Sequence, residues 1–442
     1  MATGTPRRST ISSSPTLSYS GKKSKDEILK GTRKPIIPLI SCTNENTLCF
    51  GDNLFVLREL LDNPQVGGQV DLIYIDPPYA TQMVYHSRRQ NFAYSDAIAG
   101  ADFIEYLRER IILLREILSK HGSFYLHIDE KMLFEIKIIL DEVFGPDQYR
   151  NLITRRKCNP KNFTKNTYGK NADYILFYTK SNNYTWNRPV EPLSLSSMKE
   201  YRHVEEETGR MFMKVPVHAP GVRKGETGKK WRGFTPPSGK HWQYTPAVLD
   251  EMDARGEIFW SKNGNPRRKV YYDTHEGVLV QEIWMEFKDA HNQNIKITGY
   301  PTEKNADILR RIVRTSSNPG DLILDSFAGS GTTLAVAEEL GRKWIGIDNS
   351  PESFNTIVER FRSGLRPLGI YGIKRQKEKK IVRTLFDNID PDEQFDSEPL
   401  TERKKNEVEH YSIMVLEEEY ANFMSKCKLP KWASKSITRS AQ

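Results

Sequence analysis

Two stretches of alternating strand and helix patterns, separated by a long irregular segment, most constrain what this chain can fold into. The expected strands are short apolar runs at residues 71–75, 123–128, 321–325 and 343–347. The expected helices repeat apolar residues at helical spacing over about 103–118, 130–144, 303–315, 332–340 and 351–364. Strands that alternate with helices predict a mostly parallel sheet with helices on both faces.

The composition is that of a globular protein with two or three domains. Apolar residues make up 37% of the 442 residues and charged residues 28%. No uncharged apolar run approaches the ~18 residues of a membrane span, so an integral membrane protein is not expected. The four cysteines form no C-x-x-C pair, which argues against a disulfide scaffold or zinc ribbon and fits a reducing cytosol. Because no metal-ligand spacing appears, we expect no metal site.

Changes in composition divide the chain into four parts. The N-terminal region is rich in Ser, Thr, Pro and basic residues, which predicts disorder. The C-terminal region is first basic, then acidic, and ends in a helical pattern around residues 415–424. The expected parts are a disordered basic tail over 1–40, a catalytic and cofactor domain over 41–150 and 298–366, a loop-rich insert over 151–297 and a C-terminal extension over 367–442.

The positive charge is concentrated in the insert. Residues 150–300 hold 26 Lys and Arg against 16 Asp and Glu, whereas the net charge of the whole chain is +9. A local excess of this kind suits a surface that meets nucleic acid, although a solvated basic domain is the plain alternative. The tryptophans among the basic clusters are equally suited to be the insert's own core. The candidate DNA-binding residues are Arg155, Arg156, Lys157, Lys161, Lys230, Arg232, Arg267 and Arg268.

A glycine loop follows the expected strand 321–325. It reads Ser326-Phe-Ala-Gly-Ser-Gly331, and glycines between a strand and a helix let the backbone approach a ligand closely. Asp348 ends the next strand, where an acid can bind ribose hydroxyls. A dinucleotide site is the obvious competitor, but Leu334 stands where G-x-G-x-x-G requires its third glycine, and the loop is not a P-loop. A glycine turn without a ligand is the plain alternative.

The tetrapeptide Asp76-Pro77-Pro78-Tyr79 follows the expected strand 71–75. Two prolines cannot continue a strand ladder, so they fix the chain just beyond the strand end. An acid beside a backbone carbonyl can accept both hydrogens of an amino group, and a tyrosine can stack on a planar base. Such a tetrapeptide can also be an ordinary turn. Its place after an apolar strand, in a chain that also carries the glycine loop, favours a catalytic role.

Together these motifs strongly resemble the amino-methyltransferases that act on DNA. That family uses S-adenosylmethionine to methylate adenine N6 or cytosine N4, with a catalytic motif (D/N/S)-P-P-(Y/F/W) and a cofactor loop F-x-G-x-G. The order found here, catalytic motif, insert and then cofactor loop, resembles the β group of type II and type III modification enzymes. The resemblance covers about 48–145 and 299–364. It implies a Rossmann-like methyltransferase fold with a circularly permuted motif order and a loop-rich target-recognition insert.

The resemblance also implies the site residues. The catalytic residues would be Asp76, Pro77, Pro78 and Tyr79. The cofactor-binding residues would be Asp52, Asn53, Thr302, Lys304, Asn305, Asp325, Phe327, Ala328, Gly329, Ser330, Gly331, Thr332 and Asp348. The segment 51–53 looks like the motif whose acid contacts the cofactor's adenine, and 301–305 looks like the element that helps hold its methionine end. At the ribose-binding position this chain has Asp348 where the family commonly has Glu.

The resemblance predicts site-specific methylation of double-stranded DNA on a flipped base. Adenine N6 is favoured, because Asp-Pro-Pro-Tyr leans toward adenine in this family. The alternatives are cytosine N4 methylation, a catalytically silent DNA-binding subunit, an RNA-modifying enzyme and a nucleotide-dependent dehydrogenase. His127 and the run 171–178 are interpreted as structural rather than catalytic.

The family context predicts a restriction–modification system in the cytoplasm of a bacterium, or a phage-encoded enzyme. Double-stranded DNA is the expected partner, and no membrane association is expected. A homodimer and a separate restriction or accessory subunit are left open.

Overall fold

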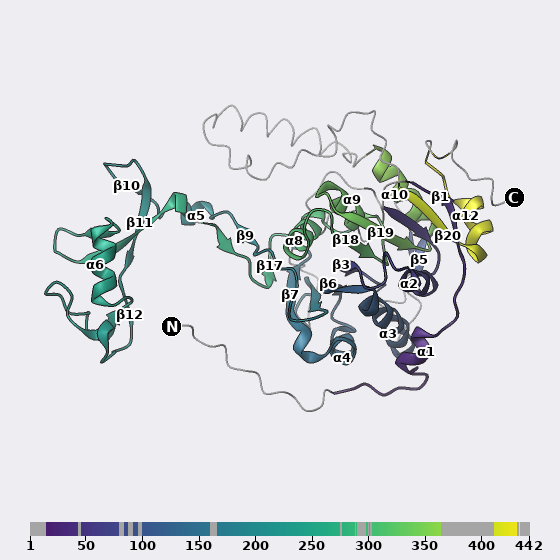
Figure 1. Cartoon of the computed structure of the whole chain (residues 1–442), viewed down its shortest axis with the longest axis horizontal. Helices are drawn as coiled ribbons and strands as arrows, with labels where there is room; N and C mark the ends of the chain where they lie inside the picture. The colour runs from purple at the N-terminus through teal and green to yellow at the C-terminus, as the bar shows by residue number, and fades with distance from the viewer. Residues whose placement is uncertain are drawn as a thin grey trace. The chain divides into compact units, whose positions relative to one another are not determined.

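The computed structural model divides the chain into two compact units, which we describe separately (Figure 1). Unit 1 consists of residues 1–187 and 281–442, and unit 2 of residues 188–280. None of the helices that the structure describes is both long enough and apolar enough to span a membrane. The described residues are 15–42, 46–78, 84–86, 92–95, 100–159, 166–274, 276–287, 289, 298, 300, 303–363, 411–430 and 433.

A ten-stranded sheet forms the centre of unit 1. The strands from β20 to β6 run parallel to one another, whereas β1 and β8 run antiparallel to their neighbours. The α/β fold with a mostly parallel sheet is therefore confirmed. In spatial order the strands are β1 (Ile36–Ile40), β20 (Ser412–Leu416), β2 (Thr47–Phe50), β19 (Lys343–Asp348), β18 (Leu322–Asp325), β3 (Val70–Ile75), β6 (Leu118–Ile128), β8 (Ala172–Thr179), β7 (Tyr149–Arg156) and β17 (Ile283–Trp284).

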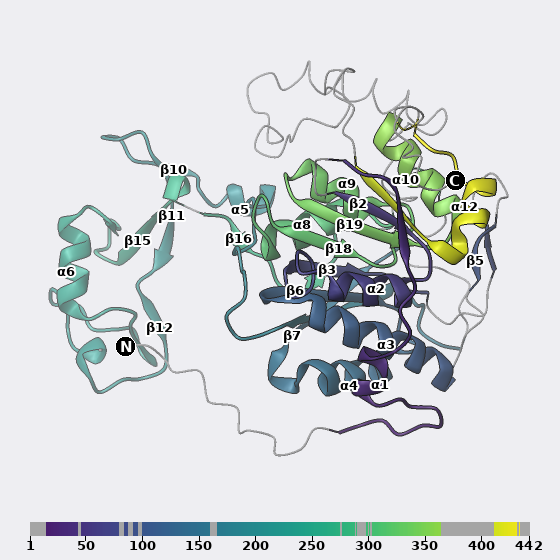
Figure 2. The same ribbon diagram turned by 45° about the vertical axis from the view of Figure 1, so that its right-hand side comes forward.

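Helices cover both faces of this sheet, as Figure 2 shows. Because successive strand residues point to opposite faces, Ile73 and Ile75 join the core on one face, whereas Tyr74 points to the other. The helices of the first face are α2 (Asn53–Asp62), α3 (Gly100–Ile117) and α4 (Leu133–Phe144). The helices of the second face are α8 (Ala306–Ser316), α9 (Thr332–Glu339) and α10 (Pro351–Ser363). A separate two-stranded ribbon is formed by β4 (Val84–His86) and β5 (Phe92–Ser95).

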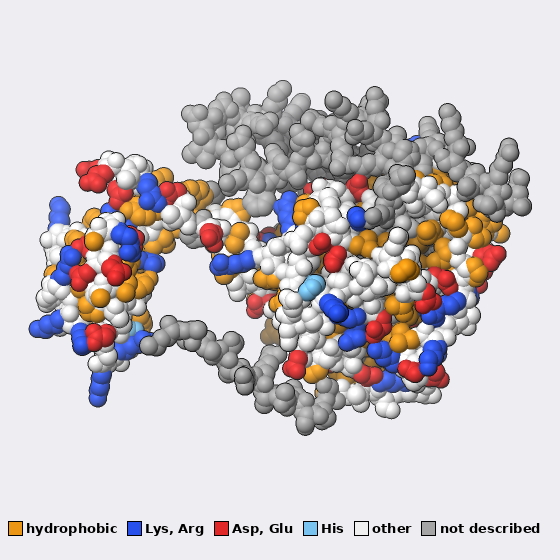
Figure 3. Space-filling view, viewed as in Figure 1, with side chains coloured by type: hydrophobic (Ala, Val, Ile, Leu, Met, Phe, Trp, Pro, Cys, Tyr) orange, Lys and Arg blue, Asp and Glu red, His pale blue; other side chains and the backbone are white. Residues whose placement is uncertain are grey.

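Unit 2 is a small β-rich body with its own core. Trp231 and Trp242 are buried there edge to face, so they are core residues, one of the two roles left open by the sequence. Figure 3 shows basic and acidic side chains intermixed on the visible face of this unit. Its elements are β9 (Val190–Glu191), α5 (Leu195–Met198), β10 (His203–Val204), β11 (Met211–Pro216), β12 (His218–Pro220), β13 (Lys240–Trp242), α6 (Pro246–Ala254), β14 (Ile258–Trp260), β15 (Pro266–Tyr271) and β16 (Val278–Leu279).

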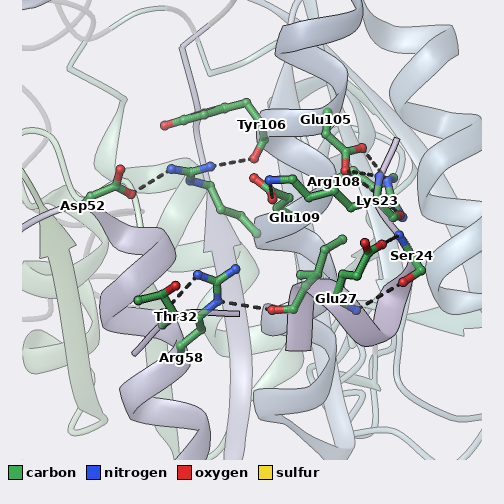
Figure 4. Close-up of polar contacts among 12 residues, drawn as sticks. Lys23, Ser24, Glu27, Thr32, Asp52, Arg58, Glu105, Tyr106, Arg108 and Glu109 are labelled. Carbon is green, nitrogen blue, oxygen red and sulfur yellow. Dashed lines mark hydrogen bonds and ion pairs between the residues drawn. The ribbon is translucent and has the colours of Figure 1, made fainter. Parts of the chain in front are cut away.

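The expected disordered tail over 1–40 is wrong for residues 15–40. The short helix α1 (Lys25–Leu29) begins at a Ser24 capping box and buries Ile28 completely. The strand β1 then pairs with β20 from the far end of the chain. Figure 4 shows this N-terminal segment held against α3 by polar contacts. Composition alone does not predict that this segment is ordered, because the residues that it contacts lie elsewhere in the sequence.

The other expected boundaries also shift. The insert expected over 151–297 gives β7, β8 and β17 to the central sheet, and only residues 188–280 form unit 2. The C-terminal extension expected over 367–442 supplies β20, which lies between β1 and β2. Where a helix was expected around 415–424, the structure has the end of β20, a single turn and α12 (Tyr420–Lys426). Pairing with distant strands decides the conformation of these segments.

The contact between the N-terminal segment and α3 generates a stability prediction. The Glu105 carboxylate accepts hydrogen bonds from the Tyr19 hydroxyl (2.6 Å), the Lys23 backbone N–H (3.0 Å) and the Arg108 guanidinium (2.8 Å). Glu105→Ala removes the near carboxylate of the buried Arg108 and leaves only Glu142, 3.9 Å away, so we expect a loss of roughly 3 kcal/mol in the free energy of unfolding. Denaturant unfolding measures this loss.

A matched control uses an ion pair on α1 itself. Lys30 and Asp26 lie 3.2 Å apart, with 80% and 77% of their side chains exposed. Lys30→Ala should cost less than about 1 kcal/mol, because water already solvates both charges. Equal losses from the two substitutions would contradict the account of how Glu105 holds the segment.

Candidate cofactor and catalytic site

One pocket at the carboxyl ends of the central parallel strands brings the two sequence motifs together. β18 pairs with β3 on one side and with β19 on the other, and β19 pairs with β2. The ends of these four strands therefore meet at one sheet edge, the usual ligand position in open α/β sheets. Asp76 follows β3, Asp325 ends β18 and Asp348 ends β19, and all three line the pocket.

The glycine loop between β18 and α9 has a backbone that only glycine adopts without strain. Gly329 and Gly331 have φ angles of 51° and 71°, in the left-handed region. A Cβ atom on Gly331 would come within 2.8 Å of Ile357, so this position also lacks room for a side chain. The Gly329 N–H donates to Asp348 Oδ2 at 2.8 Å, which ties the loop to the end of β19.

The two acids at the ends of β18 and β19 are costly to ionise. Asp325 is almost completely buried and accepts hydrogen bonds from the Thr333 hydroxyl (2.6 Å) and the Phe327 N–H (3.0 Å). Burial, together with the charges of Asp76 and Asp348, raises the pKa of Asp325 to about 7. Burial also raises the pKa of Asp348. The pocket thus carries strong negative potential when its acids are ionised, which favours a cationic ligand.

Asp52 and Asn53 line the pocket at the start of α2. Asp52 caps this helix, and its carboxylate receives the Arg110 guanidinium at 2.8 Å. Arg110, which is 3% exposed, also donates to Asn53, and its guanidinium lies 3.6 Å from the centre of the Tyr106 ring. Asn53 in turn donates to the Ser326 carbonyl at 2.7 Å. Figure 4 labels Asp52 and Tyr106 within this group. Arg110 therefore connects α3 to this part of the pocket and, through Asn53, to the glycine loop.

The segment before α8 also lines the pocket, through Glu303 and Lys304. Glu303 is buried and pairs with Arg360 of α10 at 3.1 Å. Arg360 also donates to the Ser330 carbonyl (2.7 Å) and the Thr332 hydroxyl (2.9 Å), so it ties this segment to the glycine loop. Asn305 is buried and caps α8 by accepting the N–H of Asp307. Its side-chain oxygen thereby caps the first turn of α8.

The catalytic candidate Asp76 is held by a lysine. Lys304 Nζ lies 2.6 Å from Asp76 Oδ2, and their side chains are 12% and 18% exposed. This ion pair ties the segment before α8 to the residue that follows β3. The sequence placed Lys304 only among cofactor-binding residues, whereas the structure places it against Asp76.

The structure brings most of the predicted site residues into the one pocket. The predicted residues that line it are Asp52, Asn53, Asp76, Pro77, Pro78, Lys304, Asp325, Phe327, Ala328, Gly329, Ser330, Thr332 and Asp348. Asn305 and Gly331 are not among the residues that line the pocket; they are the N-cap residues of α8 and α9. Tyr79 and Thr302 lie outside the described residues.

The sequence interpretation missed several residues of the pocket. Tyr74, Tyr106, Tyr300 and Glu303 also line it. Tyr74 could have been found from strand periodicity, since it lies two residues before Asp76 and so points to the same face. Tyr106 and Tyr300 carry no comparable signal, because only the packing of α3 and of the segment before α8 brings them to the pocket.

The candidate DNA-binding residues fare differently. Arg155 is wrong as a phosphate contact: it is completely buried and pairs with Asp173 (2.7 Å) and Asp289 (2.8 Å). Arg232 is exposed but already pairs with Asp250 at 2.9 Å. Lys161 lies outside the described residues. The remaining candidates, exposed or partly exposed, are Arg156, Lys157, Lys230, Arg267 and Arg268.

Asp325 generates a pH-dependent stability prediction. Its pKa of about 7 in the folded protein exceeds the value of about 4 expected in the unfolded chain, so folding becomes less favourable as pH rises between these values. Asp325→Asn removes this penalty. We subtract the unfolding free energy of the unsubstituted protein from that of the variant at each pH. This difference should be roughly 1–3 kcal/mol more favourable to the variant at pH 8 than at pH 5.

Denaturant unfolding of both proteins without added ligand at the two pH values makes this comparison. The same substitution at Asp26, whose side chain is 77% exposed, should give a difference that does not depend on pH. A difference for Asp325→Asn that is equal at pH 5 and pH 8 would contradict the assignment of a raised pKa.

Comparisons with known proteins bear on this site. The N6/N4 DNA methylase family model matches residues 70–359. The type II methyltransferase M.EcaI of Enterobacter cloacae is 50% identical over 327 residues, which cover 74% of this chain and 71% of that protein. The Mod subunit of the type III restriction-modification enzyme StyLTI of Salmonella typhimurium is 28% identical over 340 residues, 67% of this chain and 51% of the subunit.

Among solved structures, the M1.HpyAVI complex with S-adenosylmethionine is 17% identical, with a TM-score of 0.38, and covers 71% of this chain and 98% of that one. The family match spans more than half of the chain and includes both motifs of the pocket. The chain belongs to the N6/N4 DNA methylase family.

Proposed function

We propose that this DNA methyltransferase transfers a methyl group from S-adenosylmethionine to adenine N6 of a flipped base in double-stranded DNA. The observation that carries the proposal is the meeting of Asp76, in its Asp-Pro-Pro-Tyr motif, with the Gly329–Gly331 loop in one pocket. One motif presents acceptors for an amino group, and the other presents a close-approaching backbone next to an acid. Methyl transfer to an exocyclic amine needs both at the same sheet edge.

The residues of the pocket suit S-adenosylmethionine. Its sulfonium supplies an activated methyl group and a positive charge, which the negative potential from Asp325 and Asp348 favours. Asp348 ends β19 where an acid can accept hydrogen bonds from ribose hydroxyls, and Asp52, which lines the same pocket at the start of α2, would contact the adenine. The Gly329–Gly331 loop would lie along the cofactor, since its backbone leaves room for close approach.

Asp76 and the Pro77 carbonyl would orient the target amino group. Both can accept its hydrogens, which draws the nitrogen lone pair out of conjugation with the ring. The lone pair forms a bond to the methyl carbon, the carbon–sulfur electron pair stays on sulfur, and the nitrogen gives up one proton to the Asp76 carboxylate. Lys304 pairs with that carboxylate at 2.6 Å and so helps hold it in place. Tyr79 would stack on the flipped base.

Adenine N6 is proposed over cytosine N4 because of the acid in Asp-Pro-Pro-Tyr. The family as a whole includes both kinds of target, so cytosine N4 is the second candidate. The amino groups of the two bases have the same chemistry, and Asp76 could accept hydrogens from either.

Target recognition would belong to unit 2. Lys230 and Arg267 are exposed there and do not belong to its tryptophan core, so they are suited to contact phosphates. A restriction–modification context is proposed from M.EcaI, a type II methyltransferase, and from the StyLTI Mod subunit. A homodimer and a separate restriction subunit are further proposals of the same kind.

Removing the Asp76 carboxylate tests the proposed mechanism. Asp76→Ala should lower methyl transfer at least a hundredfold, because the amino group loses its acceptor in the transition state. The dissociation constant of S-adenosylmethionine, measured by calorimetry, should change less than about threefold. An equal loss of transfer and of cofactor binding would contradict the role of Asp76. Asp307→Ala, an exposed acid on α8, is the control and should change neither.

The product identifies the target base. The purified protein, labelled S-adenosylmethionine and unmethylated genomic DNA are incubated, and the nucleosides are analysed by mass spectrometry. We expect N6-methyladenine. N4-methylcytosine would keep the mechanism and overturn the choice of base, whereas label in neither nucleoside would overturn the proposed activity.

A further inference from the structure

A row of buried polar side chains crosses four adjacent strands beside the pocket. Tyr74 of β3 and Tyr125 of β6 are directly paired, so His127, two residues along β6, points to the same sheet face as Tyr74. On the far side, Asp173 of β8 pairs directly with Arg155 of β7. Tyr74, His127, Asp173 and Arg155 are each at most 3% exposed. Four polar groups in one row are unusual in the interior of a sheet and need mutual hydrogen bonds.

The members of this row contact one another in sequence. The Tyr74 hydroxyl lies 2.8 Å from His127 Nδ1, and His127 Nε2 lies 3.1 Å from Asp173 Oδ2. Arg155 donates from Nε to Asp173 Oδ1 at 2.7 Å and from Nη2 to Asp289 Oδ1 at 2.8 Å. Tyr74 with His127 and Arg155 with Asp173 are hydrogen-bonded pairs, and between them His127 Nε2 approaches Asp173 Oδ2 closely without forming a hydrogen bond of good geometry.

The charges of Asp173 and Arg155 determine which ring nitrogen of His127 carries the hydrogen and to which atom the Tyr74 hydroxyl donates. Burial alone would raise the pKa of the Asp173 carboxyl, but the charge and the hydrogen bonds of the Arg155 guanidinium hold it well below its usual range. Burial lowers the pKa of His127, so the imidazole is neutral. A neutral imidazole has one N–H, and the carboxylate attracts it to Nε2. His127 Nδ1 is then an acceptor, and the Tyr74 hydroxyl donates to it.

This arrangement determines what Tyr74 presents to the pocket. Tyr74 lines the pocket two residues before Asp76. Burial, and then the charges of Asp76 and Asp325, raise the pKa of Tyr74 well above its usual range, so the hydroxyl keeps its proton. A hydroxyl has one hydrogen, and here that hydrogen goes to His127. The oxygen has only lone pairs left for other groups, so it can act toward the pocket only as an acceptor.

We propose that Tyr74 is a further catalytic residue, whose oxygen stabilises the positive charge that develops on the target amino nitrogen, and that His127, Asp173 and Arg155 are its positioning residues. The inference rests on the proposed function, since it assigns Tyr74 to the same transfer step. A dipole that is already oriented when the charge develops needs no reorganisation, which is the condition for large electrostatic catalysis.

Tyr74→Phe tests the proposal directly, and Tyr125→Phe is its matched control. Tyr125 is also buried on β6 and donates to or accepts from Ser316 Oγ at 2.7 Å, so its substitution likewise removes one buried tyrosine hydrogen bond. At saturating S-adenosylmethionine and unmethylated genomic DNA, Tyr74→Phe should lower kcat about ten- to hundredfold. Tyr125→Phe should lower kcat less than about twofold. In both variants the dissociation constant of S-adenosylmethionine should stay within about threefold of the unsubstituted value.

A double substitution separates positioning from a merely structural role. If His127 acts through Tyr74, His127→Leu should lower kcat in the unsubstituted protein but change it less than about twofold in the Tyr74→Phe background. Independent, multiplicative effects of the two substitutions would overturn the proposal. So would a Tyr74→Phe variant with the kcat of the unsubstituted protein.

A spectroscopic measurement does not depend on activity and remains available if His127→Leu fails to fold. In the nitrogen NMR spectrum of ¹⁵N-histidine-labelled protein, His127 should be neutral, with its hydrogen on Nε2 and a hydrogen-bonded Nδ1. Tyr74→Phe should shift the Nδ1 resonance toward that of an imidazole nitrogen without a donor, whereas Tyr125→Phe should leave it unchanged. A hydrogen on Nδ1 would overturn the proposal. Failure of the proposed function looks different, because the unsubstituted protein would then methylate neither base.

Discussion

The backbone pairing of β18 with β3 on one side and β19 on the other is the constraint on which the whole site depends. The chain reaches β3 early and β18 only after unit 2, so these strands are distant in sequence and adjacent in space. Parallel neighbours end at the same sheet edge, and the residue after each strand therefore enters the same pocket. Asp76, Asp325 and Asp348 meet for this reason. The permuted motif order is compatible with the fold because the sheet edge, not the order along the chain, assembles the site.

Bringing several carboxylates into one pocket is unfavourable, and the surrounding structure offsets the cost with cations placed behind them. Lys304 pairs with Asp76, and Arg110 pairs with Asp52 from α3. Arg360 neutralises Glu303 and donates to the glycine loop. Asp325 accepts hydrogen bonds from two neutral donors, the Phe327 N–H and the Thr333 hydroxyl, and burial without a paired cation among the described residues raises its pKa. A cationic ligand would compensate the charge of the ionised Asp325 carboxylate, so cofactor binding and the protonation of Asp325 are linked.

The sequence predicted those parts of the fold and site in which local pattern and final structure agree. The apolar strands, the helices between them and the two motifs at strand ends required only periodicity and the chemistry of prolines and glycines. It failed where distant partners decide. Arg155 looked like a phosphate contact because it lies in a basic cluster, but Asp173 and Asp289 bury and neutralise it. The N-terminal segment looked disordered because Glu105, which holds it, lies on α3.

The buried row that ends at Tyr74 illustrates why Arg155 could not be assigned from its neighbours in sequence. The charge of Arg155 acts on the pocket through other residues. It keeps Asp173 ionised, and Asp173 fixes the hydrogen of His127 on Nε2. His127 Nδ1 then accepts the hydrogen of the Tyr74 hydroxyl. Each step needs a side chain from a different strand, so no single stretch of sequence carries the signal. A polar row in the core would only lower stability if it served packing alone, because apolar residues fill such positions more cheaply. Its end at the pocket wall, two residues before Asp76, gives it a use in the transfer step that offsets this cost.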